Sequence, residues 1–194
     1  TDKYLRSIEF APPPLGFCGS LDFGFYRTTD GGLHWDDITG HIDPMPSGIC
    51  GLAAPTPEVI YGCGVWSSPA FVIKSTDGGT TWNQTYTNDP NQSNAKDSLP
   101  LGGIKSGLTP LNMQTAWVSG VTYSDGTVYL YRTDDGGANW AQVTTLPLPP
   151  VAQTTQVGFE PVKIVTAQDA FVTVRIPSDQ SQLAVFVSND AGDN

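Results

Sequence analysis

Thr133-Asp134-Asp135-Gly136-Gly137-Ala138-Asn139-Trp140 decides how this chain folds, because the chain repeats its pattern. The pattern is [Ser/Thr]-x-Asp-x-Gly-x-x-Trp, which also matches residues 28–35 and 75–82, and residues 188–194 match it without the final Trp. The four aspartates, at positions 30, 77, 135 and 190, are 47, 58 and 55 residues apart. Regular spacing of this size in a chain rich in glycine and proline indicates a repeat architecture made of short strands.

The chemistry of the motif predicts a turn between two strands. An Asp side chain accepts hydrogen bonds from backbone N–H groups a few residues further on, and the first Ser or Thr can add a similar bond. The glycine of the pattern stands where a tight hairpin most often requires a positive φ, and the Trp then starts the next strand and buries its ring. We therefore assign structural roles to Asp30, Gly32, Trp35, Asp77, Gly79, Trp82, Asp135, Gly137, Trp140, Asp190 and Gly192. The alternative, that these aspartates are catalytic or bind a metal, is less favoured, because four equivalent turns rarely all carry chemistry.

The motif resembles the Asp-box, or BNR repeat, of sialidase-like and related β-propellers. The resemblance implies an all-β fold, a β-propeller of four-stranded antiparallel blades, with three complete blades and most of a fourth in this chain. The blades are expected at about 6–44, 48–90, 103–148 and 158–194. We interpret the chain as part of a larger ring of about six to eight blades. A closed four-bladed ring, with residues 1–6 supplying the last strand, is the alternative.

Each unit is expected to contain an apolar strand, a strand with small residues, a strand that ends in the motif, and a strand that follows it. The expected strands are 6–11, 15–20, 23–28 and 34–38; 48–53, 59–64, 70–75 and 81–86; 103–109, 115–121, 127–133 and 139–144; and 158–166, 170–175 and 184–188. Closing the first hairpin of the second unit symmetrically brings Cys50 opposite Cys63. A disulfide and two buried thiols are both compatible with that pairing.

Composition excludes several classes of function. The formal net charge is −10, which argues against a groove for nucleic acid and against an anionic membrane surface. No apolar run approaches the roughly 20 residues of a membrane span, so we expect no membrane insertion. The cysteines lack metal-binding spacing, and we expect no metal and no cofactor. The sequence shows no signal peptide, so we expect either that Thr1 follows a removed leader or that the chain is an excised piece. The expected location is extracellular or periplasmic.

Strand alternation predicts where a binding site lies. The motif turn joins the third and fourth strands, so it shares a face with the turn between the first and second. The remaining loops gather on the opposite face, and loops on a rigid scaffold usually carry binding groups. Our candidate ligand-binding residues there are Asp22, Trp66, Tyr123 and Asp125. An exposed aromatic ring beside a carboxylate suits a sugar or a protein hot spot. The alternatives are interblade packing for Trp66, a plain turn residue for Asp125 and a solvated charge for Asp22.

Three functions compete. Residues 115–120, followed by a strand and the motif, resemble a repeat of photosystem II assembly-factor-like propellers, which implies a non-catalytic propeller that binds protein or glycan. The units also resemble those of xyloglucan-degrading propellers, which makes a glycoside hydrolase the second possibility. Sialidases use three arginines, and that triad is not visible here; a pair of acids about 5–10 Å apart would be needed, and Asp22, Asp43 and Asp125 are candidates. A sorting-receptor-like propeller is third, but its cysteine-rich module is absent. We favour the binding propeller and leave enzyme activity open.

Overall fold

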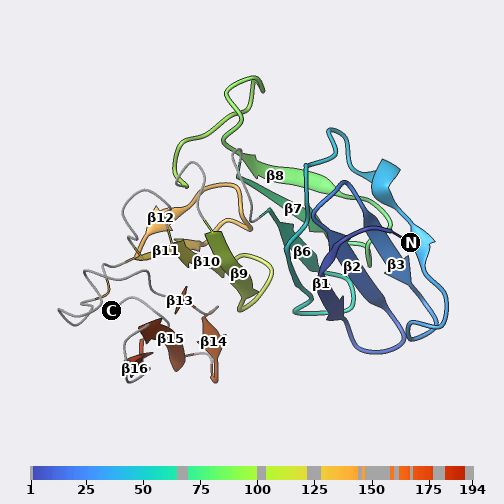
Figure 1. Cartoon of the computed structure of the whole chain (residues 1–194). Helices are drawn as coiled ribbons and strands as arrows, with labels where there is room; N and C mark the ends of the chain where they lie inside the picture. The colour runs from blue at the N-terminus through green and yellow to red at the C-terminus, as the bar shows by residue number, and fades with distance from the viewer. Residues whose placement is uncertain are drawn as a thin grey trace.

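Among the residues that the structure describes, all of the regular structure is β-strand apart from one short 3₁₀ turn, Thr39–His41. The structure is a computed structural model that describes residues 2–64, 70–99, 104–121, 128–143, 146, 158–159, 162–166, 168–176 and 182–190. The strands form four antiparallel sheets that follow one another along the chain (Figure 1). The predicted all-β fold class is confirmed, and we call the sheets blades 1 to 4.

In blades 1, 2 and 3, the strands lie across the sheet in the same order in which they occur in the chain. Blade 1 contains β1 Leu5–Phe10, β2 Gly16–Ser20, β3 Phe25–Thr28 and β4 Asp36–Asp37. Blade 2 contains β5 Gly51–Ala53, β6 Ile60–Cys63, β7 Phe71–Ser75 and β8 Asn83–Thr87. Blade 3 contains β9 Ile104–Pro110, β10 Ala116–Val121, β11 Val128–Thr133 and β12 Ala141–Gln142. Blade 4 contains β13 Gly158–Phe159, β14 Lys163–Ile164, β15 Ala170–Ile176 and β16 Gln182–Ser188.

The described strands of blade 4 occupy three positions in the sheet rather than four. Its β13 and β14 both pair with β15, with Gly158 opposite Arg175 and Lys163 opposite Phe171. They are therefore two pieces of one interrupted first strand, which we expected as a single strand over 158–166. Within the described residues, β16 is the last strand of this blade.

Two local expectations need correction. Each motif Trp lies one residue before the fourth strand and does not start it. For example, β4 begins at Asp36, the residue after Trp35. The indole Nε1 of Trp35 donates to Gly32 O at 3.1 Å, which holds the ring within the turn. In the second unit the register places Gly51, and not Cys50, opposite Cys63. The structure contains both cysteines as thiols.

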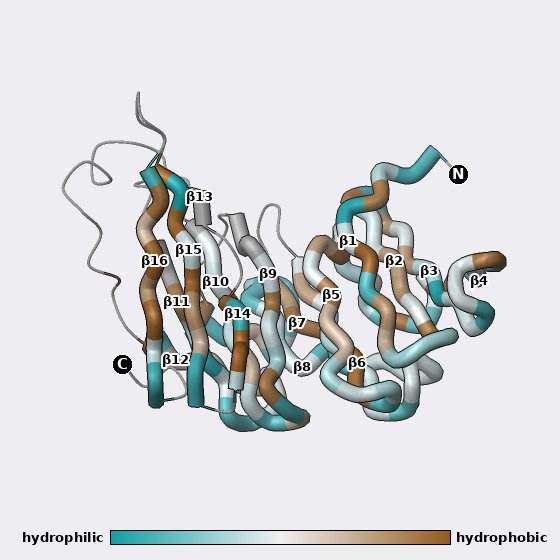
Figure 2. Tube along the Cα trace, turned by 90° about the horizontal axis from the view of Figure 1, so that it is seen from below, coloured by the Kyte–Doolittle hydropathy of each residue, from teal (hydrophilic) through white to brown (hydrophobic). Residues whose placement is uncertain are grey.

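The blades lie side by side along an arc, with their first strands next to each other (Figures 1 and 2). β1 contacts β5, and β5 contacts β9. The hydrophobic core is divided into three clusters, each shared by two neighbouring blades. Phe17 and Phe25 of blade 1 pack with Ile60, Phe71 and Trp82 of blade 2, for example. The fold is therefore held together mainly by apolar side chains between sheets, and a blade needs its neighbours to bury its faces.

The motif closes a compact turn, which we call the box turn. In blade 2 the Ser75 hydroxyl donates to Asp77 Oδ1 at 2.8 Å and accepts from Gly79 N at 2.8 Å, and Thr81 N donates to Asp77 Oδ1 at 2.9 Å. Blades 1 and 3 repeat this network, and Ser188 Oγ donates to Asp190 Oδ1 at 2.6 Å in blade 4. Both glycines of each complete box turn have positive φ: Gly31, Gly32, Gly78, Gly79, Gly136 and Gly137.

Each box turn is joined to the first hairpin turn of its own blade. Gly31 N donates to Pro14 O, Gly78 N to Glu58 O and Gly136 N to Gln114 O, at 2.8–2.9 Å. The two turns therefore lie at the same end of the blade, as strand alternation predicts. Of the other loops, the turn between β2 and β3 and the connection between blades 1 and 2 are described in full, and they lie at the opposite end, which we call the loop face.

Candidate functional site on the loop face

The turn between β2 and β3 projects an aromatic ring from the loop face. The Ser20 hydroxyl accepts hydrogen bonds from Gly24 N at 2.7 Å and Asp22 N at 3.3 Å, which makes the turn tight. Phe23 at its tip has a φ of 57°, a left-handed conformation that a non-glycine residue adopts only at a cost. Its N–H donates to Ser47 O at 3.3 Å, and its side chain is 57% exposed. The turn therefore holds a large apolar ring in water, against the connection between blades 1 and 2.

A hollow of about 230 Å³ lies between this turn and the connection that leaves blade 2. The apolar part of its lining, which we call the apolar wall, comes from blade 1, the first interblade connection and the start of β7: Phe23, Pro44, Met45, Pro46 and Phe71. The polar part, which we call the polar wall, comes from the first interblade connection, β8 and the second interblade connection: Ser47, Gln84, Thr87, Asp89 and Gln92. A ligand in the hollow would meet apolar side chains together with amide, hydroxyl and carboxylate groups.

Asp89 is the charged group of the polar wall. Its carboxylate accepts hydrogen bonds from Asn91 N at 2.9 Å and from Asn91 Nδ2 at 3.0 Å. These bonds, the backbone one first, lower the pKa of Asp89 below its ordinary value. The carboxylate is therefore ionised at neutral pH and suits a cationic or hydrogen-bond-donating group of a ligand.

A second hollow, of about 650 Å³, runs along the first strands of all four blades. Arg6, Glu9 and Lys163 contribute its charged groups. Burial raises the pKa of the Glu9 carboxyl, although a hydrogen bond from Ala54 N at 3.4 Å and the charge of Lys163 act in the opposite direction. This groove is larger and more open than the loop-face hollow.

Several solved structures have a fold similar to that of this chain. YCF48 from Cyanidioschyzon merolae superposes with a TM-score of 0.59 at 19% identity, over 94% of this chain and 56% of that one. A YCF48 structure described as bound to D1 peptide gives 0.57 at 20% identity, over 92% and 53%. The GH74 xyloglucanase from Xanthomonas campestris gives 0.56 at 16% identity, over 97% and 31%. No protein-family model and no curated protein matches the chain.

The fold is that of a β-propeller. At these identities the likeness shows the fold and not the activity. This propeller chain spans about half the length of the YCF48 chains and about a third of the xyloglucanase chain.

The propeller places one of the four predicted ligand-binding residues in its described part. Asp22 lies on the loop face, where its carboxylate is 3.9 Å from Lys3 Nζ, and Lys3 Nζ also donates to Asp22 O at 2.8 Å. Asp22 is not among the residues that line the hollow, although the neighbouring Phe23 is. Trp66, Tyr123 and Asp125 lie outside the described residues, as does Gly192 of the fourth motif.

Sequence reasoning missed Asp89, Gln92 and Met45. Asp89 and Gln92 belong to a polar segment that we expected only to connect two blades, and Met45 lies between two prolines. Only the topology of the blades could have indicated these residues, because it places both connections next to each other on the loop face.

Within the part of the chain that the structure describes, no group of three or more His, Cys, Asp or Glu side chains could hold a metal ion. In that same part, the structure contains no helix with the length and apolar character needed to span a membrane.

Proposed function

We propose that this chain is a non-catalytic propeller that binds a peptide segment of a partner protein in the loop-face hollow between Phe23 and Asp89. The observation that carries the proposal is the exposure of the Phe23 ring, which a strained turn holds at the edge of an amphipathic hollow. Exposed aromatic side chains beside polar groups are typical anchors of protein interfaces.

The chemistry of the two walls favours a peptide over a glycan. The apolar wall combines a phenyl ring, a thioether and two proline rings, which suits an aliphatic or aromatic side chain. The amides of Gln84 and Gln92 can pair with backbone N–H and C=O groups, and Asp89 can pair with a lysine or arginine. A sugar would stack best on an exposed Trp or Tyr, and the described lining contains neither.

The comparisons agree with this choice by analogy. One of the similar YCF48 structures is described as bound to a peptide. At 20% identity this likeness supports the fold alone. The proposal that the ligand is a peptide therefore rests on the residues that line the hollow.

Glycoside hydrolysis is the second candidate, and the xyloglucanase-like fold is the observation that favours it. Hydrolysis requires two carboxyl groups about 5–10 Å apart across the substrate. Among the described residues that line the hollow, Asp89 is the one carboxylate. The hollow therefore suits binding better than acid catalysis.

The test begins with a displayed library of random short peptides selected on the immobilised chain. Selected peptides are then titrated by calorimetry against the wild type, Phe23→Gly and Asp89→Asn, with Leu33→Ala as the control because Leu33 is exposed in a box turn at the other end of blade 1. We expect Phe23→Gly to weaken binding about tenfold or more and Leu33→Ala to leave it unchanged. Peptides that bind Phe23→Gly as tightly as the wild type would exclude this hollow, and turnover of xyloglucan oligosaccharides would favour the hydrolase.

We also propose that the protein works outside the cytoplasm, in an extracellular or periplasmic compartment. Its acidic surface and its small number of cysteines are compatible with that location. Fractionation of cells that express the tagged full-length protein tests the proposal, and recovery in the cytoplasm alone would contradict it.

A further inference from the structure

A β-bulge in blade 2 builds part of the polar wall of the loop-face hollow. Phe71 of β7 lies opposite Thr87 of β8. Two residues further along β7, Ile73 lies opposite Gln84, which is three residues back along β8. In a regular strand, residues 84 and 87 would point to opposite faces of the sheet. The extra residue of the bulge places both on the face of Phe71, and so both line the hollow.

The polar wall offers hydrogen-bond acceptors to a ligand. Gln84 Nε2 donates to Gln92 Oε1 at 3.4 Å, a bond that uses a donor of Gln84 and leaves its own Oε1 as an acceptor. Asp89 is fixed by a tight turn, in which Gln92 N donates to Asp89 O at 3.0 Å and Asp89 N donates to Thr87 Oγ1 at 3.1 Å. Both bonds from Asn91 end on Asp89 Oδ1, so the second carboxylate oxygen receives neither of them.

The negative charge of Asp89 is not neutralised within the described part of the chain. None of the ion pairs there involves Asp89. Lys96, the cation closest to it in the sequence, donates instead to Ala138 O and Asn139 Oδ1 in the box turn of blade 3. The net charge of −10 adds to the attraction for a cationic partner. The polar wall therefore lacks a positively charged group that a ligand can supply.

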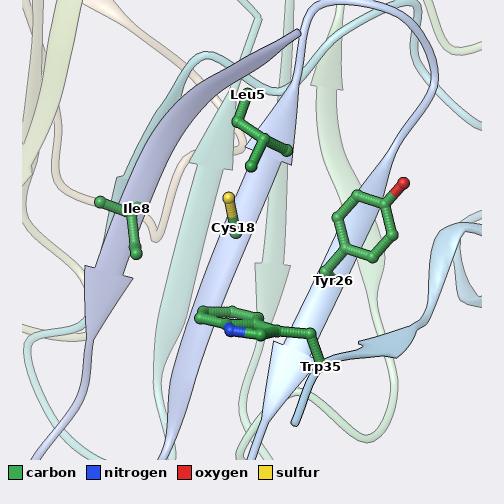
Figure 3. Close-up of a pocket in the computed structure, with 5 residues that line it drawn as sticks. All are labelled: Leu5, Ile8, Cys18, Tyr26 and Trp35. Carbon is green, nitrogen blue, oxygen red and sulfur yellow. The ribbon is translucent and has the colours of Figure 1, made fainter. Parts of the chain in front are cut away.

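An apolar hollow in blade 1 shows by contrast what the loop-face hollow adds. Its volume is about 320 Å³, and its described lining contains no Asp, Glu, Lys or Arg: Leu5, Ile8, Cys18, Tyr26 and Trp35 (Figure 3). That lining suits an uncharged apolar group. The loop-face hollow combines an apolar wall with a fixed carboxylate, so it suits a side chain that is apolar along its length and cationic at its end.

We propose that an arginine side chain of the partner peptide fills the loop-face hollow, with its aliphatic stem on the apolar wall and its guanidinium group against Asp89. This inference rests on the proposed function and names the residue by which the peptide is recognised. It requires one side chain to satisfy both walls of the hollow.

Arginine matches these walls better than lysine does. The guanidinium group is planar and carries five N–H donors in a fixed fork, so it bonds to the Asp89 carboxylate and the Gln84 amide oxygen together. Its flat face stacks on an aromatic ring, and Phe23 supplies one at the edge of the hollow. A lysine ammonium is a compact point charge without this planar fork.

The test uses the peptides selected from the displayed library on the immobilised wild-type chain. We expect arginine to be enriched over lysine at one position of these peptides. Replacing this arginine by citrulline, which keeps the shape of the side chain but is uncharged, should weaken binding about tenfold or more, and lysine should not restore it. These changes leave the protein untouched, so misfolding does not contribute to the loss.

Asp89→Asn is the matching change in the protein. We expect it to weaken binding of the arginine peptide about tenfold or more in calorimetry, and to abolish the preference for arginine over citrulline, because the two changes remove the same contact. Glu58→Gln is the control, since Glu58 is an exposed carboxylate in the first hairpin turn of blade 2, at the box-turn end. It should leave both the affinity and the preference unchanged.

The outcomes separate this inference from the proposed function. Peptides that depend on Phe23 but show no preference for arginine over lysine would overturn the inference alone, as would equal losses in Asp89→Asn and Glu58→Gln. If no peptide is selected, or if the peptides bind Phe23→Gly as tightly as the wild type, the proposed function fails and this inference fails with it.

Discussion

Trp82 of blade 2 and Phe25 of blade 1 meet edge to face, with ring centroids 4.9 Å apart and ring planes at 73°. The two residues are far apart in the sequence, and both belong to the first interblade cluster. Because edge-to-face pairs bury large areas in a preferred geometry, this contact ties one repeat to the next.

Trp82→Ala is expected to lower the free energy of unfolding by about 3–5 kcal/mol, because it removes a buried indole and leaves a cavity between two sheets. Urea unfolding followed by circular dichroism measures the change. Trp35→Ala is the matched control, and it should cost clearly less because its ring is only half-buried. Equal losses in the two variants would contradict the division of the core between blades.

Gly79→Ala is expected to destabilise the chain more than Gly78→Ala, although both glycines belong to one turn and have φ of 77° and 69°. A left-handed conformation costs an alanine roughly 1–2 kcal/mol at either position. A Cβ at Gly79 would also lie 2.3 Å from Cε1 of Phe17, whereas the nearest atom to a Cβ at Gly78 is Pro57 O at 3.5 Å. Thermal melts of the two variants give the comparison, and similar melting temperatures would show that the Phe17 ring moves aside without cost.

Asp77→Asn is expected to remove part of the acid sensitivity of the fold. Hydrogen bonds from the Thr81 hydroxyl and the Thr81 N–H lower the pKa of Asp77 to about 2, from an ordinary 3.8. A carboxyl whose pKa is lowered on folding contributes stability above 3.8 and loses it as the pH falls towards 2. The variant should therefore melt lower than the wild type at neutral pH, with a difference that shrinks in this acidic range. A difference in melting temperature that does not change with pH would show that the ionised Asp77 carboxylate does not stabilise the fold.

Glu9→Gln is expected to raise the melting temperature at neutral pH. Burial raises the pKa of Glu9, so the folded chain carries a penalty when the carboxyl is ionised, and the penalty disappears below the ordinary value of 4.5. The amide oxygen of Gln can still accept the hydrogen bond from Ala54 N. Melts across this pH range check the sign, because the advantage of the variant should vanish in acid.

Phe23→Gly is expected to keep or increase stability, because glycine adopts the φ of 57° without strain and the lost ring is mostly exposed. The stabilisation is of the order of 1 kcal/mol. Phe23→Ala removes the same ring but keeps the strain, so it should be less stable than Phe23→Gly in urea unfolding. Equal stability of the two variants would show that the left-handed conformation of residue 23 costs no free energy.

Most strands could be placed from the sequence because the box turn marks the end of every third strand. The hydrogen bonds of the turn join residues at most four positions apart, such as Ser75 with Gly79, so the local sequence contains the whole network. The incorrect predictions concern strands whose pairing depends on a partner strand further along the chain. The Cys63 register depends on how β5 meets β6, and the break between β13 and β14 depends on pairing with β15.

The candidate site could be assigned to a face but not to its residues. Strand alternation places the loops, and Phe23 lies beside the predicted Asp22. Asp89 could not be found in this way, because its distance from Phe23 along the chain hides their common position at one hollow. The polar composition of its segment indicates only a connection.

The sequence by itself determined the repeat, the all-β fold and the end of the blade at which the box turns lie, because turn chemistry and strand alternation are local properties. Only the tertiary structure decided which residues line the hollow, and which apolar faces are covered. Val72 and Val185 hold the same place in the repeat, yet one is buried and the other is exposed. The physical reason is that burial belongs to a pair of neighbouring sheets, and a single repeat does not contain its neighbour.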